Sequence, residues 1–181
     1  MRFLSRIHFW GLAIAAALFA LDQWVKWLMV YPLQLRQQGE IVVTSFFSFR
    51  YAENRGVSFG MFPAESLETR LLLIAVTSLI SLVVLVWMLR EKRFIDVLAL
   101  AMILGGALGN IWDRLRDGYV TDYLDLHFGG ISIFNIFNLA DTWITLGVVI
   151  ILARALFLRE KQPQEGHEAH IEGAEKPAET N

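Results

Sequence analysis

Four long apolar stretches restrict what this chain can fold into. They occupy residues 8–31, 67–89, 94–112 and 138–158, and each is close to or above the roughly 20 helical residues that cross a bilayer. The chain is 55% hydrophobic and only 19% charged, which is too apolar for an ordinary soluble domain. We therefore expect an all-α membrane protein with four transmembrane helices.

Basic residues predict the orientation of these spans, because Lys and Arg are enriched at cytoplasmic ends. Both termini should be cytoplasmic, with residues 32–66 and 113–137 outside. Three arginines in the first outer segment, Arg36, Arg50 and Arg55, weaken this bias without reversing it. The cations that support it precede the first span, join the second to the third and follow the fourth: Arg2, Arg6, the run REKR at 90–93, Arg154, Arg159 and Lys161.

The first span has an alternative interpretation as a cleaved signal peptide, since it has a basic start and an Ala-rich core. Its apolar run continues through residues 24–30, beyond a usual signal core, which favours a retained helix. Residues 1–159 should then form one membrane domain. The polar segment 160–181 should be a disordered cytoplasmic tail, in which His167 and His170 lack a shell that could hold a metal.

Charge and cysteine usage exclude several classes of function. The formal net charge is −2, so no basic surface suggests a nucleic-acid partner. Cysteine is absent, which excludes disulfides, thiolate metal sites and a cysteine nucleophile. Any catalysis must therefore use Asp, Glu, His, Ser, Thr, Tyr or Lys.

The first outer segment has a strand-like pattern. Phe47, Phe49 and Tyr51 alternate with Ser48 and Arg50, which is the period of a half-buried strand. The following ENRG supplies residues that tolerate positive φ and so favour a turn. We expect a small extracytoplasmic sheet here and a short outer loop over residues 123–137.

Ionisable residues inside the spans are candidates for function, because burying them in lipid is costly. Asp22 and Lys26 are four apart and share a helix face, which fits an internal ion pair and a functional site equally well. Asn110, Asp113 and Arg114 also share a face, and a salt bridge between the last two is a purely structural reading. Within the same span, the residues at 105 and 109 are a small-xxx-small pair that allows close helix packing.

Further carboxylates follow at the outer ends of the last two spans. Asn138 can cap the fourth helix, and Asp141 suits its positive end, so a capping role alone would explain both. Asp122 alone could be a loop carboxylate. Together they form an outward-facing acidic cluster, and two neighbouring carboxylates that share a proton can act as general base and general acid, as in aspartic proteases.

Five short motifs, in this order and with this spacing, are similar to those of the bacterial lipoprotein signal peptidases (type II signal peptidases). They are DQWVK at 22–26, ENRGVSF at 53–59, GGALGNIWDR at 105–114, GYVTDY at 118–123 and FNLAD at 137–141. The resemblance covers nearly the whole chain before the polar tail. Ser58 stands where Ala is more usual, Thr121 stands where the family commonly has Val, and the loop between the last two motifs differs.

The resemblance implies an intramembrane aspartic endopeptidase that cleaves diacylglyceryl-modified prolipoproteins before the lipidated cysteine, at the outer face of the bacterial inner membrane. Its active site would face the periplasm, with Asp122 and Asp141 as the catalytic dyad. Asp113 would position Arg114, while Asp117 and Asp125 would be solvated. The positions matching the family's substrate-binding or site-supporting residues are Asp22, Lys26, Asn54, Gly56, Asn110, Asp113, Arg114, Asn138 and Ala140.

No cofactor or metal is expected, since His127 is the only histidine near the acidic cluster and zinc sites usually recruit several nitrogen or sulfur ligands. Prolipoproteins and membrane lipids would be the partners of a monomer. The alternative is a non-catalytic ion or proton carrier that uses the acidic cluster. The inner halves of the third and fourth spans are nearly all apolar, whereas a path across the membrane needs polar groups at every depth.

Overall fold

The computed structural model describes residues 5–56, 66–128, 131–132 and 135–157 of the 181-residue chain. The predicted tail at 160–181 and Ser58 lie outside the described residues. Helices α1, α3, α4 and α5 are long and apolar enough to cross a membrane, which confirms the mostly helical class. The elements, in chain order, are α1 (Arg6–Val30), α2 (Leu35–Gln38), β1 (Glu40–Thr44), β2 (Phe47–Asn54), α3 (Leu67–Arg90), α4 (Phe94–Arg116), β3 (Val120–Phe128), β4 (Ile131–Ser132) and α5 (Leu139–Phe157).

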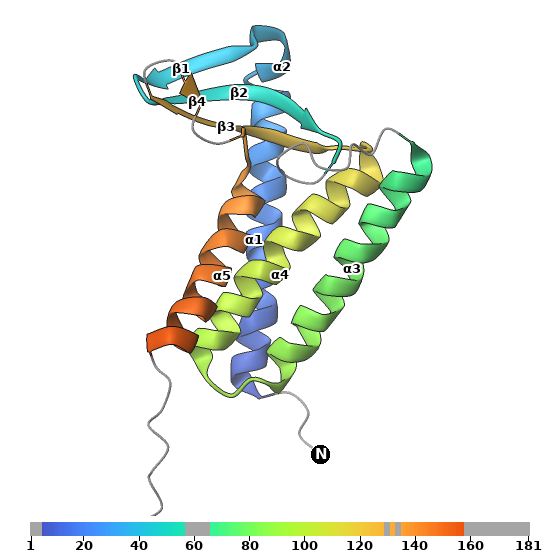
Figure 1. Cartoon of the computed structure of the whole chain (residues 1–181), viewed down its shortest axis with the longest axis vertical. Coiled ribbons are helices and arrows are strands. Elements are labelled where there is room, and N and C mark those ends of the chain that lie inside the picture. The colour runs from blue at the N-terminus through green and yellow to red at the C-terminus, as the bar shows by residue number, and fades with distance from the viewer. Residues whose placement is uncertain (1–4, 57–65, 129–130, 133–134, 158–181) are drawn as a thin grey trace, which may run out of the picture.

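Helix α4 is the centre of the bundle and packs against α1, α3 and α5 (Figure 1). Its buried core residues Val97, Leu100 and Leu104 lie with Ala15 of α1 and Met88 of α3 in one apolar cluster. The helix extends four residues beyond the predicted end at residue 112. Asp113 and Arg114 are therefore held on a rigid helical turn rather than in an outer connection.

The predicted small-residue pair on α4 brings α1 close. A Cβ added at Gly105 would lie 2.7 Å from the Ala15 carbonyl oxygen, and one at Gly109 would lie 2.5 Å from Asp22 Oδ2. Both separations are below van der Waals contact, so only glycine allows α1 to approach α4 in this way. The close approach also brings the polar residues of α1 against those of α4.

Helix α1 is an integral part of this bundle, which does not fit the alternative of a cleaved signal peptide. Its first turn is joined to the α3–α4 connection by His8, whose Nε2 lies 2.8 Å from the carbonyl oxygen of Glu91. The backbone N–H of Ser5 donates to His8 Nδ1 at 3.1 Å, so Nε2 carries the proton and donates to that carbonyl.

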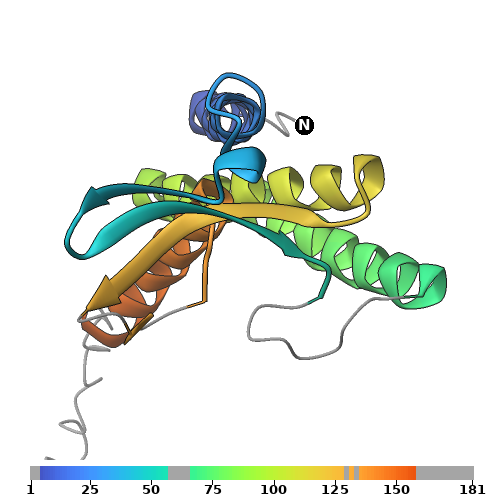
Figure 2. The same ribbon diagram turned by 90° about the horizontal axis from the view of Figure 1, so that it is seen from above.

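A four-stranded sheet in the order β1-β2-β3-β4 lies across one end of the bundle, and the two described chain ends lie at the other (Figure 1). Seen from above, the strands pass between α1 and α5 (Figure 2). The strand predicted at Phe47–Tyr51 is confirmed as β2, but the loop predicted over 123–137 is wrong. β3 occupies much of it because it pairs antiparallel with β2, which places Asp122 opposite Ala52.

The burial of side chains on one face of β2 also differs from the prediction. Ser48, expected on the polar face, is fully buried, whereas Arg50 is exposed. Ser48 is covered because it lies in register with Asp125 of β3, a strand that the sequence pattern did not predict. Pairing with a neighbouring strand therefore overrode the local alternation.

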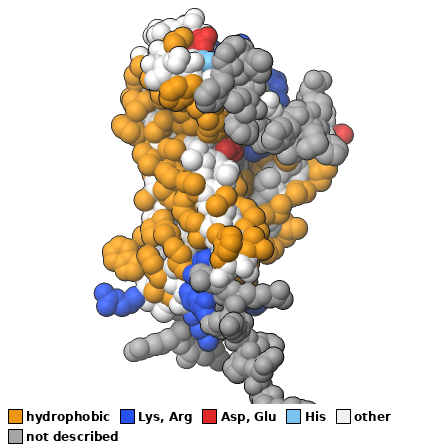
Figure 3. All heavy atoms as spheres, turned by 60° about the vertical axis from the view of Figure 1, so that its left-hand side comes forward, with side chains coloured by type: hydrophobic (Ala, Val, Ile, Leu, Met, Phe, Trp, Pro, Cys, Tyr) orange, Lys and Arg blue, Asp and Glu red, His pale blue; other side chains and the backbone are white. Residues whose placement is uncertain are grey.

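The outer surface of the helices is largely apolar, as Figure 3 shows for one face, and Lys and Arg side chains gather near the end away from the sheet. Helix α3 contributes most to this surface, with Leu72, Leu79 and Val83 each at least 60% exposed. Such a continuous apolar surface would be unfavourable in water and is suited to lipid.

Candidate active site

Two carboxylates lie at the sheet end of the bundle, joined by two asparagine amides. Asn138 Nδ2 donates to Asp122 Oδ1 at 2.6 Å, and Asn110 Nδ2 donates to Asp141 Oδ1 at 2.8 Å. The two amides are themselves joined, since Asn138 Nδ2 lies 3.2 Å from Asn110 Oδ1. Asp122 on β3, Asp141 on α5 and Asn110 on α4 are thereby held in one polar cluster.

The beginning of α5 fixes the position of Asp141. Asn138 Oδ1 accepts the backbone N–H of Asp141 at 3.0 Å, and Asp141 Oδ2 accepts the backbone N–H of Asn138 at 3.3 Å. This reciprocal pattern satisfies N–H groups that a helix start leaves free, and it confirms the predicted cap. Asp141 thus combines a capping contact with a second oxygen bound by Asn110.

The environment of Asp122 favours its protonated form. Its side chain is only 2% exposed, and burial together with the nearby negative charge of Asp141 raises its pKa to about 7. Hydrogen bonds from Asn138 and Asn54 act in the opposite direction, since they stabilise the carboxylate. Near neutral pH the pair can therefore hold one proton between them, which is the state that general acid–base chemistry requires.

Lys26 connects the first helix to this cluster. Its Nζ lies 2.8 Å from Asp22 Oδ2 and 2.8 Å from Asp113 Oδ2, and it donates to Asn110 Oδ1 at 3.3 Å. The predicted ion pair between Asp22 and Lys26 is confirmed. The reading of Asp113 as the partner of Arg114 is wrong, because the close approach of α1 brings Lys26 to Asp113 instead.

Asp22 also holds the start of α5. Its Oδ1 accepts the backbone N–H of Ala140 at 3.0 Å, so a carboxylate of the first helix caps the last one. Ala140 is fully buried and lies one residue before Asp141. The contact therefore sets the position of Asp141 relative to α1.

Gln23 is a site residue that the sequence reasoning missed. Its Nε2 donates to Asp113 Oδ1 at 2.8 Å and approaches Asp22 Oδ2 at 3.2 Å. It lies next to Asp22 in the DQWVK motif, and a polar amide inside an apolar span was the signal that could have identified it.

Arg114 ties α4 to the segment that follows β2. One guanidinium nitrogen donates to the carbonyl oxygen of Gly56 at 2.9 Å and another to that of Asn110 at 3.3 Å. Asn54 Oδ1 accepts the backbone N–H of Gly56 at 3.2 Å, which shapes the turn. The predicted site residues Asn54, Gly56, Asn110 and Arg114 are thus brought together around the two carboxylates.

Asp117 and Asp125 were both expected to be solvated, and the structure separates them. Asp117 is exposed and pairs with Arg116. Asp125 is only 2% exposed, so that expectation is wrong, because strand pairing places it beside Ser48. Within the described residues, no group of three or more His, Cys, Asp or Glu side chains is arranged to hold a metal ion.

Comparison with known proteins identifies the family. Residues 14–157 match the family model described as signal peptidase (SPase) II. The chain belongs to the signal peptidase II family. A lipoprotein signal peptidase of Sphingopyxis alaskensis is 52% identical over 154 residues, covering 85% of this chain and 89% of the relative. Another, from Rhizorhabdus wittichii, is 48% identical over 160 residues, covering 88% and 93%.

Solved structures agree with this fold. A bacterial membrane enzyme determined at 2.3 Å resolution has a TM-score of 0.69 at 24% identity, covering 84% of this chain and 93% of its own. A second bacterial membrane enzyme, at 1.9 Å, has a TM-score of 0.68 at 25% identity, covering 81% and 92%. As a signal peptidase II, this protein is a membrane peptidase, and the alternative of a non-catalytic carrier is not favoured.

Proposed function

We propose that this signal peptidase II removes the signal peptide from diacylglyceryl-modified prolipoproteins, with Asp122 and Asp141 as its catalytic pair. The relatives at 52% and 48% identity, both lipoprotein signal peptidases, support the substrate class. The observation that carries the catalytic assignment is the amide-bridged cluster. It holds one deeply buried carboxylate of raised pKa close to a second, half-buried one.

In the proposed mechanism, Asp122 holds the shared proton and Asp141 is ionised. Asp141 accepts a proton from a water molecule whose oxygen attacks the scissile carbonyl carbon, while Asp122 donates its proton to the carbonyl oxygen. The tetrahedral intermediate collapses as the C–N bond breaks: Asp141 gives the proton that it took from water to the leaving nitrogen, and Asp122 takes back a proton from a hydroxyl of the intermediate as the new carboxyl group forms. Asn110 and Asn138 keep the two carboxyl groups oriented through the hydrogen bonds that they donate.

The proposal includes the location of the site. The scissile bond would lie just before the lipidated cysteine, at the outer face of the bacterial inner membrane, so that the lipid anchor stays in the bilayer. The active site would face the periplasm and both termini the cytoplasm. The basic connection at residues 90–93, at the end of the bundle opposite the sheet, supports this orientation. One chain supplies every residue of the cluster, which supports a functional monomer.

The test is cleavage of a lipidated prolipoprotein by purified Asp122→Asn and Asp141→Asn variants in detergent. Asn keeps the size of the side chain but cannot exchange a proton, so each variant should lose roughly 10²- to 10⁴-fold in activity. Asp96→Asn, at the opposite end of α4, is the matched control, and thermal unfolding verifies that the variants fold. The wild-type pH profile should be bell-shaped, with both limbs belonging to the coupled pair.

Near wild-type cleavage by either folded variant would contradict the assignment of this pair. Asp113 and Asp22 would then be the next carboxylates to test. Ion flux through protein-containing liposomes, without cleavage, would instead support the carrier alternative.

A further inference from the structure

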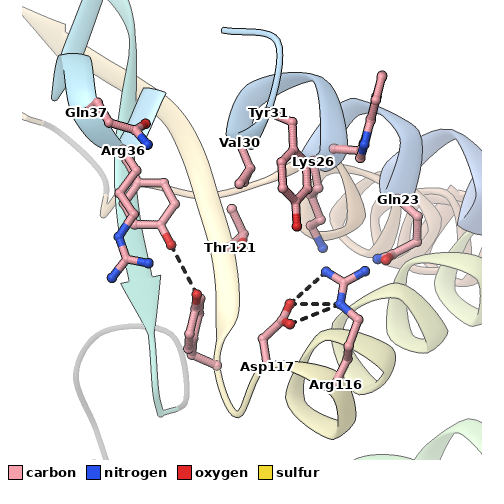
Figure 4. Close-up of a pocket in the computed structure, with 12 residues that line it drawn as sticks. Gln23, Lys26, Val30, Tyr31, Arg36, Gln37, Arg116, Asp117 and Thr121 are labelled. Atoms are coloured by element: carbon pink, nitrogen blue, oxygen red, sulfur yellow. Dashed lines mark hydrogen bonds and ion pairs between the residues drawn. The ribbon is translucent and has the colours of Figure 1, made fainter. Parts of the chain in front are cut away.

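A cavity lies between α1 and the sheet (Figure 4). Its volume is about 310 Å³, and it is bounded by the outer part of α1, by α2, by β2 and β3 and by the end of α4. Thr121 lines it, whereas Asp122 and Asp141 do not. Successive residues of a strand point to opposite faces, so Thr121 and Asp122 lie on opposite faces of β3. Gln23 and Lys26 line the cavity and also contact the acidic cluster.

The lining of this cavity, which we call the back cavity, is rich in hydrogen-bond donors. Six of its side chains carry N–H groups, while Asp117 is the one carboxylate among the lining residues. Arg116 and Asp117 pair at 2.6 Å, as Figure 4 shows. The hydroxyl of Tyr51 donates to that of Tyr119 at 3.3 Å. The donor side chains are Gln23, Lys26, Trp27, Arg36, Gln37 and Arg116.

Carboxylates neutralise the positive charges of Lys26 and Arg36 in the back cavity. Lys26, whose side chain is only 3% exposed, pairs with Asp22 and Asp113, and Arg36 pairs with Glu53 at 3.1 Å. Each guanidinium nevertheless has five N–H groups, and one carboxylate partner leaves some of them to donate to a ligand. The cavity is therefore suited to a ligand rich in oxygen acceptors rather than to a bare multivalent anion.

The position of the back cavity relative to the bilayer indicates where such a ligand comes from. Trp27 and Tyr31 line it and are 50% and 65% exposed, close to the sheet end of α1. Aromatic side chains of this kind concentrate at the level of lipid headgroups. Lys26 lies five residues, or about 7.5 Å along the helix, deeper than Tyr31. The back cavity therefore lies at the level of the membrane boundary.

We propose that the back cavity binds the headgroup of a membrane phospholipid. The phosphate accepts N–H donors from the two arginines of the lining, Arg36 and Arg116. Guanidinium groups favour phosphate through paired N–H donors. Thr121 adds a hydroxyl to the lining of the back cavity.

The test measures phospholipid binding to the full-length protein in detergent by native mass spectrometry. Phosphatidylglycerol is titrated against diacylglycerol with the same acyl chains, which lacks the phosphate. The wild-type protein should bind one phosphatidylglycerol at least tenfold more tightly than diacylglycerol. Combined Arg36→Gln and Arg116→Gln should remove this preference, because charge-assisted hydrogen bonds to the phosphate are lost.

Two further variants make the result specific. Arg50→Gln changes an exposed arginine of the same sheet that does not line the back cavity, so its binding should equal wild type. Thr121→Val keeps the shape of the side chain and should weaken binding about threefold to tenfold, as expected for one lost hydrogen bond.

Equal binding of both lipids, or unchanged binding in the double arginine variant, would overturn the proposal. Complete competition by inorganic phosphate at equal concentration would also overturn it, since the site would then take the free ion. The readout is binding, so it does not depend on whether Asp122 and Asp141 perform the peptidase chemistry.

Discussion

Burial of Asp122 should make the stability of this protein depend on pH in a way that one substitution removes. The folded carboxyl has a pKa of about 7, against an ordinary value of 3.8. Below pH 3.8 the Asp122 carboxyl is protonated in both the folded and the unfolded protein, so it does not lower the stability. As the pH rises from 3.8 to about 7, the unfolded chain loses this proton while the folded protein keeps it, so the wild-type protein loses stability across that window.

The magnitude follows from the same two values. At about 1.36 kcal/mol per pH unit, the interval between 3.8 and about 7 corresponds to about 4 kcal/mol. Asp122→Asn does not titrate, and its Oδ1 can still accept the hydrogen bond from Asn138. Relative to wild type, the variant should therefore gain about 4 kcal/mol of stability between pH 4 and pH 8, a figure that already includes relief of the repulsion by Asp141.

The assay is thermal unfolding in detergent from pH 4 to pH 9, followed by the fluorescence of the six tryptophans. The Tm of Asp122→Asn minus that of wild type should rise by on the order of 10 °C across the window and then level off. Glu68→Gln, which changes an exposed carboxyl in the first turn of α3 outside the acidic cluster, is the control for a carboxyl-to-amide substitution. A constant or falling difference for Asp122→Asn would refute the reasoning.

Three other perturbations have distinct expected outcomes. Lys26→Met should destabilise the protein by roughly 3–5 kcal/mol in denaturation measurements, because it leaves two buried carboxylates without their cation, and an unchanged midpoint would contradict this. Gly106→Ala should lower the Tm and the yield of folded protein, since its methyl group would collide with the Ala140 backbone carbonyl. A wild-type Tm would show that α4 and α5 can move apart at little cost in free energy. Treatment with a chelator should leave cleavage of lipidated substrate unchanged, and a loss that a divalent ion restores would establish a metal requirement.

Features set by local periodicity were predictable from the sequence. The four apolar stretches predicted the helices, the i,i+4 spacing predicted the Asp22–Lys26 pair, and the residues at the start of the fourth span predicted the Asn138 cap. Each depends on residues within about one helical turn. The close packing of α1 on α4 at Gly105 was likewise visible as a small-residue spacing.

Features set by contacts between distant segments were not predictable in this way. Asp22 accepts the backbone N–H of Ala140, 118 positions later, and no local sequence pattern predicts that contact. The strand that holds Asp122 and Asp125 looked like a loop because it pairs with β2 across about 75 positions and carries two acidic residues, which are uncommon in strands. The burial of Asp125 and the contact of Asp113 with Lys26 also depend on segments that are distant in the sequence, so they were not predicted.

The cap between the first and last helices has a consequence for how the protein is made. Helix α1 is synthesised first, long before the backbone N–H of Ala140 exists to occupy Asp22 Oδ1. During that interval Lys26, one turn away, can neutralise Asp22, so the helix can enter the bilayer without an unpaired charge. Insertion of α5 then adds the cap and brings Asp141 to the cluster in a single event. The polar cluster is therefore completed only when the last helix arrives, and a nascent chain that ends before residue 138 carries Asp122 without its partner.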